Sequence, residues 1–313
     1  MSADFTEVSS AGIPRSPVVS VVMVTYNHER FIGQAIEGVV KQETSFPIEL
    51  VIGEDCSTDG TRGIVLDWQR RYPHLIRVVL QNRNRGAAAN VRAVLGCSRG
   101  TYVAQLEGDD YWTDTAKLQS QVDALMAQPE AALCGARAYV WRDGDDAPSE
   151  IQPSDPLETL MASGARGMFE GQWWLRTCTK MIRRDMLTRV PPHLSGDWTS
   201  TLWILAQTGL APVCFVDRIV GVYRLHAGGA WSALSEQQRC LIDVRSIADL
   251  IPWLTGRERA HMMSELQSRL DELATRGTPA AVRLRAAQGL LAAEPFAFWR
   301  WRLARPLLRP QRD

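Results

Sequence analysis

The amino-terminal part of the chain repeats one pattern four times: an apolar run, a short polar segment, and a stretch with helical hydrophobic spacing. A short apolar run between turn signals is typical of a buried strand, and apolar residues at helical spacing indicate a helix packed on it. The four runs lie at residues 18–24, 48–52, 76–80 and 102–106. Because strands that alternate with crossover helices pair in parallel, the pattern predicts a Rossmann-like α/β fold, in which helices flank a mainly parallel central sheet.

The pattern changes in the second half of the chain. Residues 141–170 are rich in Asp, Pro, Ser and Gly, which predicts a loop or lid. Two short strands are expected at 213–216 and 219–223, and helical spacing dominates from Leu234 onward. We therefore expect three parts: a disordered amino terminus at 1–17, one α/β domain at 18–231, and a helical carboxyl-terminal region at 232–313.

The composition of the chain argues against nucleic acid as a partner and indicates where the protein is located. Lys plus Arg and Asp plus Glu both number 35 in the 313-residue chain, so the net charge is zero and no overall field attracts nucleic acid. The first seventeen residues have neither a basic start nor an apolar stretch of signal-peptide length, so secretion is not expected, and no uninterrupted apolar run is long enough to span a bilayer. Six cysteines lie far apart without a C-x-x-C pair, which favours reduced thiols over a zinc site. These features predict a cytoplasmic protein.

Polar residues follow every one of the four predicted strands. In an open α/β sheet, ligands bind beyond the carboxyl ends of the strands, where the loops meet. The last of these loops carries three acids, Glu107, Asp109 and Asp110, which repel one another unless a cation compensates their charge. Mg²⁺ or Mn²⁺ typically takes few protein carboxylates and leaves its other positions to water and phosphate oxygens, so the loop favours a metal-bound diphosphate. An acidic helix cap and turn is the alternative.

Four segments carry a resemblance to a known family, in matching order and spacing. They are Val-Ser-Val-Val-Met-Val-Thr-Tyr-Asn (19–27), Val-Ile-Gly-Glu-Asp-Cys-Ser-Thr-Asp-Gly-Thr (51–61), Asn-Arg-Gly-Ala-Ala-Ala-Asn (84–90) and Glu-Gly-Asp-Asp-Tyr-Trp (107–112). Together they resemble the successive motifs of the inverting family 2 glycosyltransferases, which have the GT-A fold. The resemblance extends through Gly196-Asp197-Trp198 and Tyr223-Arg224-Leu225-His226, and so covers about residues 18–231. The commoner pattern has Asp where this chain has Glu107, which indicates a subgroup with a Glu-Gly-Asp-Asp-Tyr-Trp metal motif.

The resemblance implies a nucleotide-diphosphate sugar donor, bound by about residues 18–115. Tyr26 would lie against the nucleobase and Asp55 would accept a hydrogen bond from a ring N–H, a pairing most natural for uracil and hence for a UDP-sugar. GDP and dTDP donors stay open, and each residue taken alone could equally be a strand-end aromatic or a turn acid. The residues expected to contact the donor are Thr25, Tyr26, Asn27, Glu29, Asp55, Asn84, Gly86, Asn90, Glu107, Asp109 and Arg224.

The resemblance also implies a metal-assisted single displacement. Asp109 and Asp110 would contact Mn²⁺ or Mg²⁺, a Lewis acid for the departing nucleotide, and His226 is either a further metal ligand or a structural histidine. Because an acceptor hydroxyl is a poor nucleophile at neutral pH, a carboxylate must take its proton. Asp197 matches the place of the family's general base, with a simple helix cap as the alternative. Direct attack from the acceptor side, expected at 116–231, would invert the anomeric configuration.

Other classes fit the sequence less well. A nucleotidyltransferase would show a glycine-rich, lysine-bearing loop after the first strand, whereas this chain has Thr-Tyr-Asn-His-Glu there. A glycoside hydrolase has no use for diphosphate-binding loops. A processive synthase would carry a Q-x-x-R-W motif after Asp197, which this chain lacks. A nucleotide-sugar-binding module without catalytic activity is the main remaining alternative.

The acceptor stays open: a saccharide or a lipid-linked saccharide, in bacterial polysaccharide or glycoconjugate synthesis. The segment Phe-Ala-Phe-Trp-Arg-Trp-Arg at 296–302 mixes aromatic and cationic side chains. Such a segment could make a peripheral contact with the inner face of the cell membrane, or it could dock on its own domain.

Overall fold

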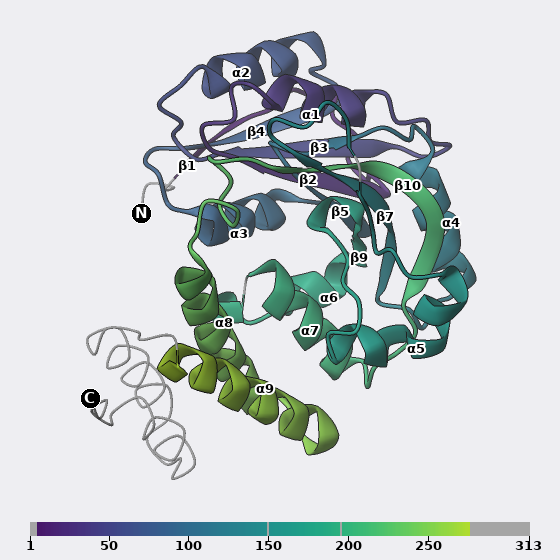
Figure 1. Cartoon of the computed structure of the whole chain (residues 1–313). Coiled ribbons are helices and arrows are strands. Elements are labelled where there is room, and N and C mark those ends of the chain that lie inside the picture. Colours follow the sequence, from purple (N-terminus) through teal and green to yellow (C-terminus); the bar gives the residue numbers. More distant parts are fainter. Residues whose placement is uncertain (1–4, 149, 195, 276–313) are drawn as a thin grey trace.

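The computed structural model describes residues 5–148, 150–194 and 196–275. Its centre is a 10-stranded sheet in the order β1-β4-β3-β2-β5-β9-β7-β10-β6, with β8 paired to β7 (Figure 1). The strands are β1 (Phe5–Val8), β2 (Val19–Thr25), β3 (Ile48–Glu54), β4 (Ile76–Gln81), β5 (Tyr102–Glu107), β6 (Tyr111–Trp112), β7 (Leu133–Arg142), β8 (Glu150–Gln152), β9 (Met181–Arg183) and β10 (Cys214–Leu225).

Helices cover the sheet and extend beyond it. They are α1 (Ile32–Val40), α2 (Thr61–Arg71), α3 (Ala87–Cys97), α4 (Lys117–Ala127), α5 (Leu157–Phe169), α6 (Arg184–Thr188), α7 (Asp197–Gln207), α8 (Glu236–Leu250) and α9 (Gly256–Thr275). Three short 3-10 turns join them: η1 (Thr177–Thr179), η2 (Pro192–Leu194) and η3 (Ile251–Trp253).

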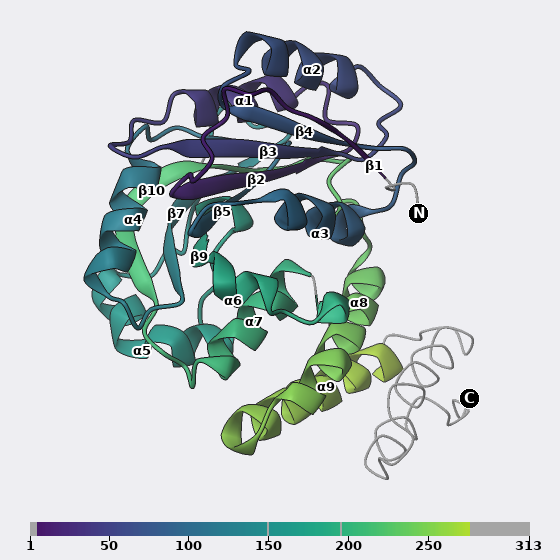
Figure 2. The same ribbon diagram turned by 180° about the vertical axis from the view of Figure 1, so that it is seen from behind.

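The first half of the sheet is the predicted strand-helix repeat. Strands β4, β3, β2 and β5 pair in parallel, so their carboxyl ends meet along one edge. Successive side chains of a strand point to opposite faces, and β2 contributes Val21 to the core beneath α1 and Val22 to the core that includes α3. Helices α1 and α2 lie on one face and α3 on the other, as Figures 1 and 2 show from opposite sides. The predicted α/β fold with a mainly parallel sheet is confirmed.

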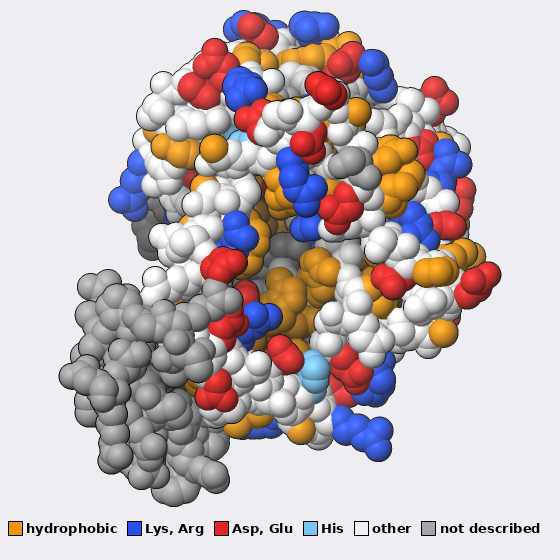
Figure 3. All heavy atoms as spheres, in the orientation of Figure 1, with side chains coloured by type: hydrophobic (Ala, Val, Ile, Leu, Met, Phe, Trp, Pro, Cys, Tyr) orange, Lys and Arg blue, Asp and Glu red, His pale blue; other side chains and the backbone are white. Residues whose placement is uncertain are grey.

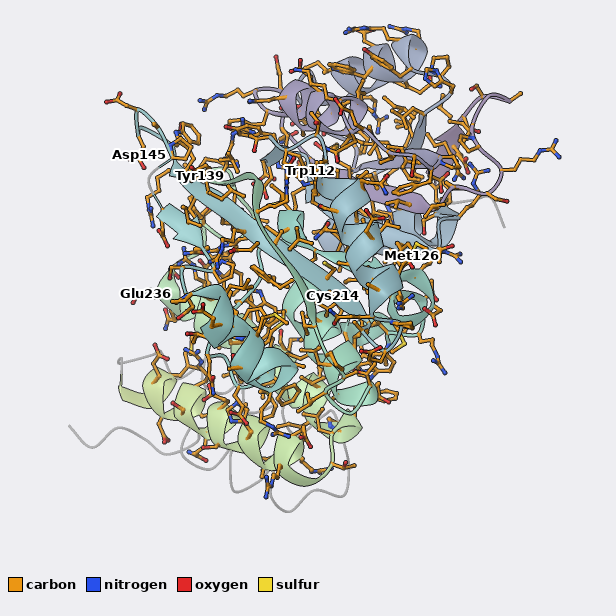
Figure 4. All side chains as sticks on the ribbon, turned by 90° about the vertical axis from the view of Figure 1, so that its right-hand side faces the viewer. Trp112, Met126, Tyr139, Asp145, Cys214 and Glu236 are labelled. Carbon is orange, nitrogen blue, oxygen red and sulfur yellow. The ribbon has the colours of Figure 1, made fainter. Side chains whose placement is uncertain are left out.

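The second half of the sheet is built from distant parts of the chain. Strands β7 and β10 pair in parallel, and the antiparallel strand β9 joins β7 to β5. The two short strands expected at 213–216 and 219–223 form the single strand β10, because register shifts after Val216 and Ile219 accommodate the polar residues between them without ending the pairing. Helix α4 covers this half, and Figure 4 shows Trp112 near its first turn and Cys214 near its last.

The amino terminus differs from its prediction. Residues 1–17 are expected to be disordered, but Phe5–Val8 forms the edge strand β1, antiparallel to β4. The Arg77 guanidinium on β4 holds this strand through an ion pair with Glu7 at 2.8 Å. A short edge strand with alternate polar residues has little hydrophobic signal of its own, which is why the composition alone was misleading.

The segment 141–170 is also more ordered than expected. It contains β8 and the helix α5, whose Leu160 and Met168 are buried in the core. Gly164, at a φ of +52°, bends α5 where another residue would be strained. The lid interpretation is therefore wrong for residues 157–169.

Helix α8 packs against both α7 and α9 below the sheet in Figure 1. Helix α8 begins with a capping box, in which Ser235 Oγ accepts the Gln238 N–H at 3.3 Å and the Gln238 side chain accepts the Ser235 N–H at 2.8 Å. The predicted helical carboxyl-terminal region is confirmed as far as Thr275. The aromatic and basic segment 296–302 lies outside the described residues.

Lys117, in the first turn of α4, is a fully buried cation. Its Nζ donates to Gln121 Oε1 at 2.7 Å and lies 4.2 Å from the centre of the Trp112 ring. Burial lowers the pKa of Lys117 to about 7. This lysine therefore changes charge close to neutral pH.

We expect Lys117→Met to stabilise the protein, most strongly at acidic pH. The unfolded chain keeps the lysine proton up to its ordinary pKa of 10.5, whereas the folded chain releases it near pH 7. The charged lysine therefore destabilises the fold fully below pH 7, and this penalty fades as the pH rises toward 10. The gain in Tm over the wild type should be larger at pH 6 than at pH 9. Lys41→Met, at an exposed lysine, is the control; an equal gain at both pH values would contradict the assignment.

Candidate active site

The loops after β2 and β3 are held together by main-chain and side-chain hydrogen bonds. The Asp55 N–H donates to the Thr25 carbonyl at 3.1 Å, and Asn27 Oδ1 accepts the Thr58 N–H at 2.8 Å. Asn27 has a φ of +55°, a conformation that asparagine adopts more readily than most residues. Tyr26 beside it is 39% exposed. The two loops form one surface, on which the predicted base-stacking tyrosine is accessible.

Asp55 organises a third loop. Its carboxylate is 2% exposed and accepts the N–H groups of Arg85 and Gly86, each at 2.8 Å. Gly86 has a φ of +80°, which favours glycine, and its N–H also lies 3.1 Å from Asn84 Oδ1. A carboxylate has about four lone-pair positions, so these two bonds leave room for the predicted hydrogen bond from a base. That contact stays a prediction.

Two other residues expected at the donor make contacts within the protein. The Glu29 carboxylate accepts the Gly60 N–H at 2.7 Å. Asn90 is buried, donates to the Gly53 carbonyl at 2.8 Å and accepts from Gln81 at 3.2 Å. Glu29 thus ties the loop after β2 to the loop after β3, and Asn90 ties α3 to β3 and β4.

The loop after β5 adjoins the first loop. The Gly108 N–H donates to the Val24 carbonyl at 2.9 Å, and a Cβ at Gly108 would come within 2.7 Å of Thr25 Oγ1. Only glycine allows this approach without a shift of the threonine. The acidic loop therefore lies at the same edge of the sheet as the loops after β2, β3 and β4, as the sequence predicts. We call these three the nucleotide-side loops, because the sequence predicts that they contact the nucleotide.

The acidic loop is tied to the end of β10. Asp110 is 1% exposed, and its Oδ1 accepts the backbone N–H of Arg224 at 2.8 Å. Asp109 Oδ2 lies 3.1 Å from His226 Nε2 and 3.6 Å from His28 Nε2. The Arg224 guanidinium donates to the Asp109 carbonyl at 2.6 Å. The structure thus brings together the four predicted residues Asp109, Asp110, Arg224 and His226, and adds His28.

The two aspartates differ in acidity. Burial, with Asp109 and Glu107 nearby, raises the pKa of Asp110 well above its ordinary value. Burial alone would also raise the pKa of Asp109, but the hydrogen bond with His226 and the charge of His28 bring it below the ordinary value. Burial lowers the pKa of His28 itself. Asp109 is thus the better anion, whereas the hydrogen bond and charge of Arg224 only partly offset the burial of Asp110 and the repulsion from its acidic neighbours.

The acidic loop suits a divalent cation. Within the described residues, Asp110 Oδ2 is buried and has no hydrogen-bond partner. Among the described residues, no group of three or more His, Cys, Asp or Glu side chains is arranged to hold a metal ion. Mg²⁺ and Mn²⁺ typically take few protein carboxylates and complete their coordination with phosphate and water.

A cavity of about 590 Å³ opens beside the acidic loop. Figure 3 shows a hollow on this face, with hydrophobic side chains inside and charged side chains at its rim. The acidic loop and the end of β10 line one part, and Trp174, Trp198 and Trp231 add aromatic surface. Helices α8 and α9 supply another wall, with Ile242, Asp243, Ser246, Ile247, Glu265 and Arg269. Its size is that of a typical small-molecule site.

The sequence model of glycosyl transferase family 2 matches residues 20–190, more than half of the chain. The chain belongs to glycosyltransferase family 2. The matched segment contains the three nucleotide-side loops and the acidic loop. The end of β10 and the α8–α9 wall lie beyond it.

Relatives with similar sequences support this placement. An uncharacterised Mycobacterium tuberculosis protein is 33% identical over 234 residues, which cover 72% of this chain and 64% of that protein. TuaG of Bacillus subtilis, provisionally named a teichuronic acid biosynthesis glycosyltransferase, is 38% identical over 152 residues, 46% of this chain and 59% of TuaG. The match thus spans less than two thirds of either relative.

Solved structures share the fold. TarS of S. aureus, in complex with UDP-GlcNAc, has a TM-score of 0.62 at 20% identity, covering 93% of this chain and 88% of that one. The mannosyltransferase PcManGT of Pyrobaculum calidifontis, in complex with GDP-Man and Mn²⁺, has a TM-score of 0.59 at 21% identity, covering 94% of this chain and 85% of that one. These likenesses confirm the GT-A fold of this family member.

The position of the predicted base is defined by its neighbours. Asp197 is the first residue of α7, but its side chain lies outside the described residues. Gly196 and Trp198 on either side line the cavity, together with Thr199. The start of α7 therefore borders the cavity that the acidic loop also borders.

Sequence reasoning missed several residues of the site. His28 faces Asp109 from the first loop, and Trp174 and Arg176 line the cavity from a segment without a recognisable motif. A histidine next to the Tyr-Asn pair was the one signal that could have indicated His28. No helix in the described part of the chain has the length and apolar character needed to cross a bilayer.

We expect Asp55→Ala to loosen the third loop and to cost about 2–4 kcal/mol of unfolding free energy, because two N–H groups would lose a charged acceptor. Denaturant unfolding would measure the cost, and hydrogen exchange at Arg85 and Gly86 would locate it. Asn84→Ala removes only one longer contact and is the matched control. Equal stability of the two variants would contradict the role of Asp55 as an organiser.

Proposed function

We propose that this protein is an inverting glycosyltransferase that moves a sugar from a nucleoside diphosphate to an acceptor hydroxyl. The carrying observation is that the acidic loop, the end of β10 and the start of α7 border one cavity. The nucleotide-side loops adjoin the acidic loop through main-chain contact between Gly108 and Val24. A transferase for two substrates needs this continuous arrangement of a donor surface, a diphosphate centre and an acceptor cavity.

A UDP-sugar is the proposed donor. Tyr26 is exposed in the loop after β2, and the Asp55 N–H donates to the carbonyl of the adjacent Thr25. In this proposal a base stacked on the tyrosine donates its ring N–H to the Asp55 carboxylate. Thr25, Asn27, Asn84 and Gly86 shape the same surface. TarS was solved with UDP-GlcNAc and PcManGT with GDP-Man, so the choice of uracil rests on the Asp55 pairing and not on the fold.

Asp109 and Asp110 are the proposed ligands of Mn²⁺ or Mg²⁺. When bound, the ion would neutralise charge that develops on the departing nucleoside diphosphate. The protein's own contribution is to keep the site ready: His226 and His28 favour the ionised form of Asp109, and the β10 backbone fixes Asp110. Because His226 bonds to Asp109, it acts in this proposal through that carboxylate, and its direct contact with the metal stays open.

Arg224 and Glu107 complete the proposed donor side. The Arg224 guanidinium lies between aromatic rings, 4.3 Å from the centre of Tyr111 and 4.9 Å from that of Phe31. This packing holds a cation at the acidic loop, where a diphosphate would need one. Glu107 lines the same cavity, and its proposed role is to contact the ribose or the sugar.

Asp197 is the proposed general base. It is the first residue of α7, and its neighbours Gly196 and Trp198 line the cavity in which an acceptor hydroxyl would approach the donor sugar. Removal of the hydroxyl proton as the C–O bond forms would activate the nucleophile, and attack opposite the departing diphosphate would invert the anomeric carbon. The step needs no covalent intermediate with the protein.

The proposed acceptor is a saccharide, free or lipid-linked, in bacterial polysaccharide or glycoconjugate synthesis. Three tryptophans in the cavity supply flat apolar surface, and such surface with few polar groups is typical of organic ligand sites. The provisional name of TuaG points to the same kind of pathway.

Manganese should be required for nucleotide binding. We expect UDP to raise the Tm of the wild type only when Mn²⁺ is present, and EDTA to abolish the shift, because ligand binding to the native state stabilises it. Asp110→Asn should lose most of the shift yet fold normally, since the amide oxygen still accepts the Arg224 N–H. Asp67→Asn, on the exposed side of α2, should behave as wild type. An Mn²⁺-independent shift would refute the metal assignment.

Asp197→Asn should separate binding from transfer. The variant keeps the size of the side chain but cannot take a proton, so we expect unchanged UDP affinity in the presence of Mn²⁺ and at least about a hundredfold slower sugar transfer. Release of UDP from UDP-sugars in the presence of an acceptor extract would measure transfer. Normal turnover by the variant would mean that another residue is the base.

A further inference from the structure

Three arginines line the cavity, and two of them are committed to contacts within the protein. Arg224 donates to the Asp109 carbonyl and to Gln34. Arg269 lies 4.0 Å from the carboxylate of Asp243 and 3.4 Å from that of Glu272. Arg224 is thereby held at the acidic loop, where the diphosphate is proposed to bind, and the charge of Arg269 is balanced within the α8–α9 wall.

Arg176 is different. Its Nε donates to Gln152 Oε1 at 2.6 Å, and its guanidinium lies 4.4 Å from the centre of the Tyr223 ring. Within the described part of the chain it forms no ion pair, and its two terminal nitrogens have no protein acceptor. The ring beneath and the amide at Nε fix the plane of the guanidinium, so the remaining donors form a preoriented fork at the cavity surface.

A fixed, planar guanidinium is the side chain best suited to a carboxylate or phosphate, which it binds through two parallel hydrogen bonds. Partial burial strengthens such a bond, because little water competes for the donors. We propose that Arg176 selects an anionic substituent, a carboxylate or phosphate group, on a saccharide bound in the cavity. This inference rests on the proposed glycosyltransferase function and names the substrate class of its cavity.

The position of Arg176 favours the saccharide over the donor diphosphate. The diphosphate is assigned to the acidic loop, where Arg224 already supplies a cation. Arg176 comes from the segment between Trp174 and η1, and it lines the cavity with Trp174 and Trp198. The anionic group could belong to the donor sugar or to the acceptor, and both sources present the same chemistry to the fork.

Two donors that differ by one charge test whether the anionic group belongs to the donor sugar. Calorimetric titration of the full chain with Mn²⁺ would compare UDP-glucose with UDP-glucuronic acid, in which a carboxylate replaces the hydroxymethyl group. If the donor carries the anion, the wild type should bind UDP-glucuronic acid at least about tenfold more tightly. Arg176→Met should remove this preference and leave the affinity for UDP unchanged.

A second arm tests the acceptor source. With UDP and Mn²⁺ bound, the wild type would be titrated with methyl glucuronide, glucose 6-phosphate and methyl glucoside. If the acceptor carries the anion, either charged ligand should bind at least about tenfold more tightly than the glucoside, and Arg176→Met should lose this difference. Arg176→Lys keeps the positive charge but lacks the planar pair of donors, so it should retain only part of the difference in affinity. Arg218→Met, at an exposed arginine, should show the same difference as the wild type.

The outcomes separate this inference from the proposed function. A preference for the charged ligand in either arm that depends on Arg176 supports the inference. No preference in the wild type in both arms overturns it, and this comparison does not depend on the folding of any variant. An equal loss of affinity for UDP and both UDP-sugars in Arg176→Met would also overturn it, because the arginine would then contact the diphosphate. Failure of every nucleotide and nucleotide sugar to bind with Mn²⁺ would overturn the proposed function, and this inference with it.

Discussion

The repulsion between carboxylates crowded at the end of β5 determines how the carboxyl edge of the sheet is built. Burial of a carboxylate beside like charges is costly unless hydrogen bonds or positive charge compensate it. The fold supplies both: the β10 backbone donates to Asp110, while His226 and His28 surround Asp109. These groups come from the loop after β2 and from the far end of the domain. These contacts join the acidic loop, the loop after β2 and the end of β10 at one edge of the sheet.

A second buried carboxylate in the same sheet, that of Glu49, has its burial fully compensated by hydrogen bonds and positive charge. Glu49, at the amino end of β3, accepts from Ser20 at 2.6 Å and from Arg77 and Arg99, each at 2.8 Å. Burial would raise the pKa of Glu49, but these hydrogen bonds bring it below its ordinary value. Asp110, at the carboxyl end of β5, keeps a raised pKa and an oxygen without a partner in the described chain. Glu49 therefore has a structural role. The charge of Asp110 is only partly compensated within the protein, so a bound cation could compensate the rest.

Much of the fold followed from local pattern, and the failures have physical causes. The parallel strands and their helices were predictable because long apolar runs and helical spacing are strong signals. Strand β1 depends on the exposed edge of β4, and β10 passes through polar residues by a register shift, so both require knowledge of the neighbouring strand. In the candidate site, Asp109 and Asp110 could be predicted because they lie in one short segment of the sequence. The roles of His28 and Arg176 arise only when segments distant in the chain meet.

The cavity is lined by residues from both sides of position 231, the expected boundary between the α/β domain and the helical carboxyl-terminal region. The family match ends at residue 190, after the acidic loop and the loops proposed to bind the nucleotide. Beyond residue 190, the cavity is lined by the start of α7, the end of β10, residues 229–232, and side chains of α8 and α9. Groups that handle a diphosphate must keep a strict geometry, whereas a wall of packed helices can change its side chains without disturbing the sheet. The carboxyl-terminal helices are therefore part of the cavity that is proposed to bind the acceptor, and under that proposal the side chains that they present would determine which acceptor fits.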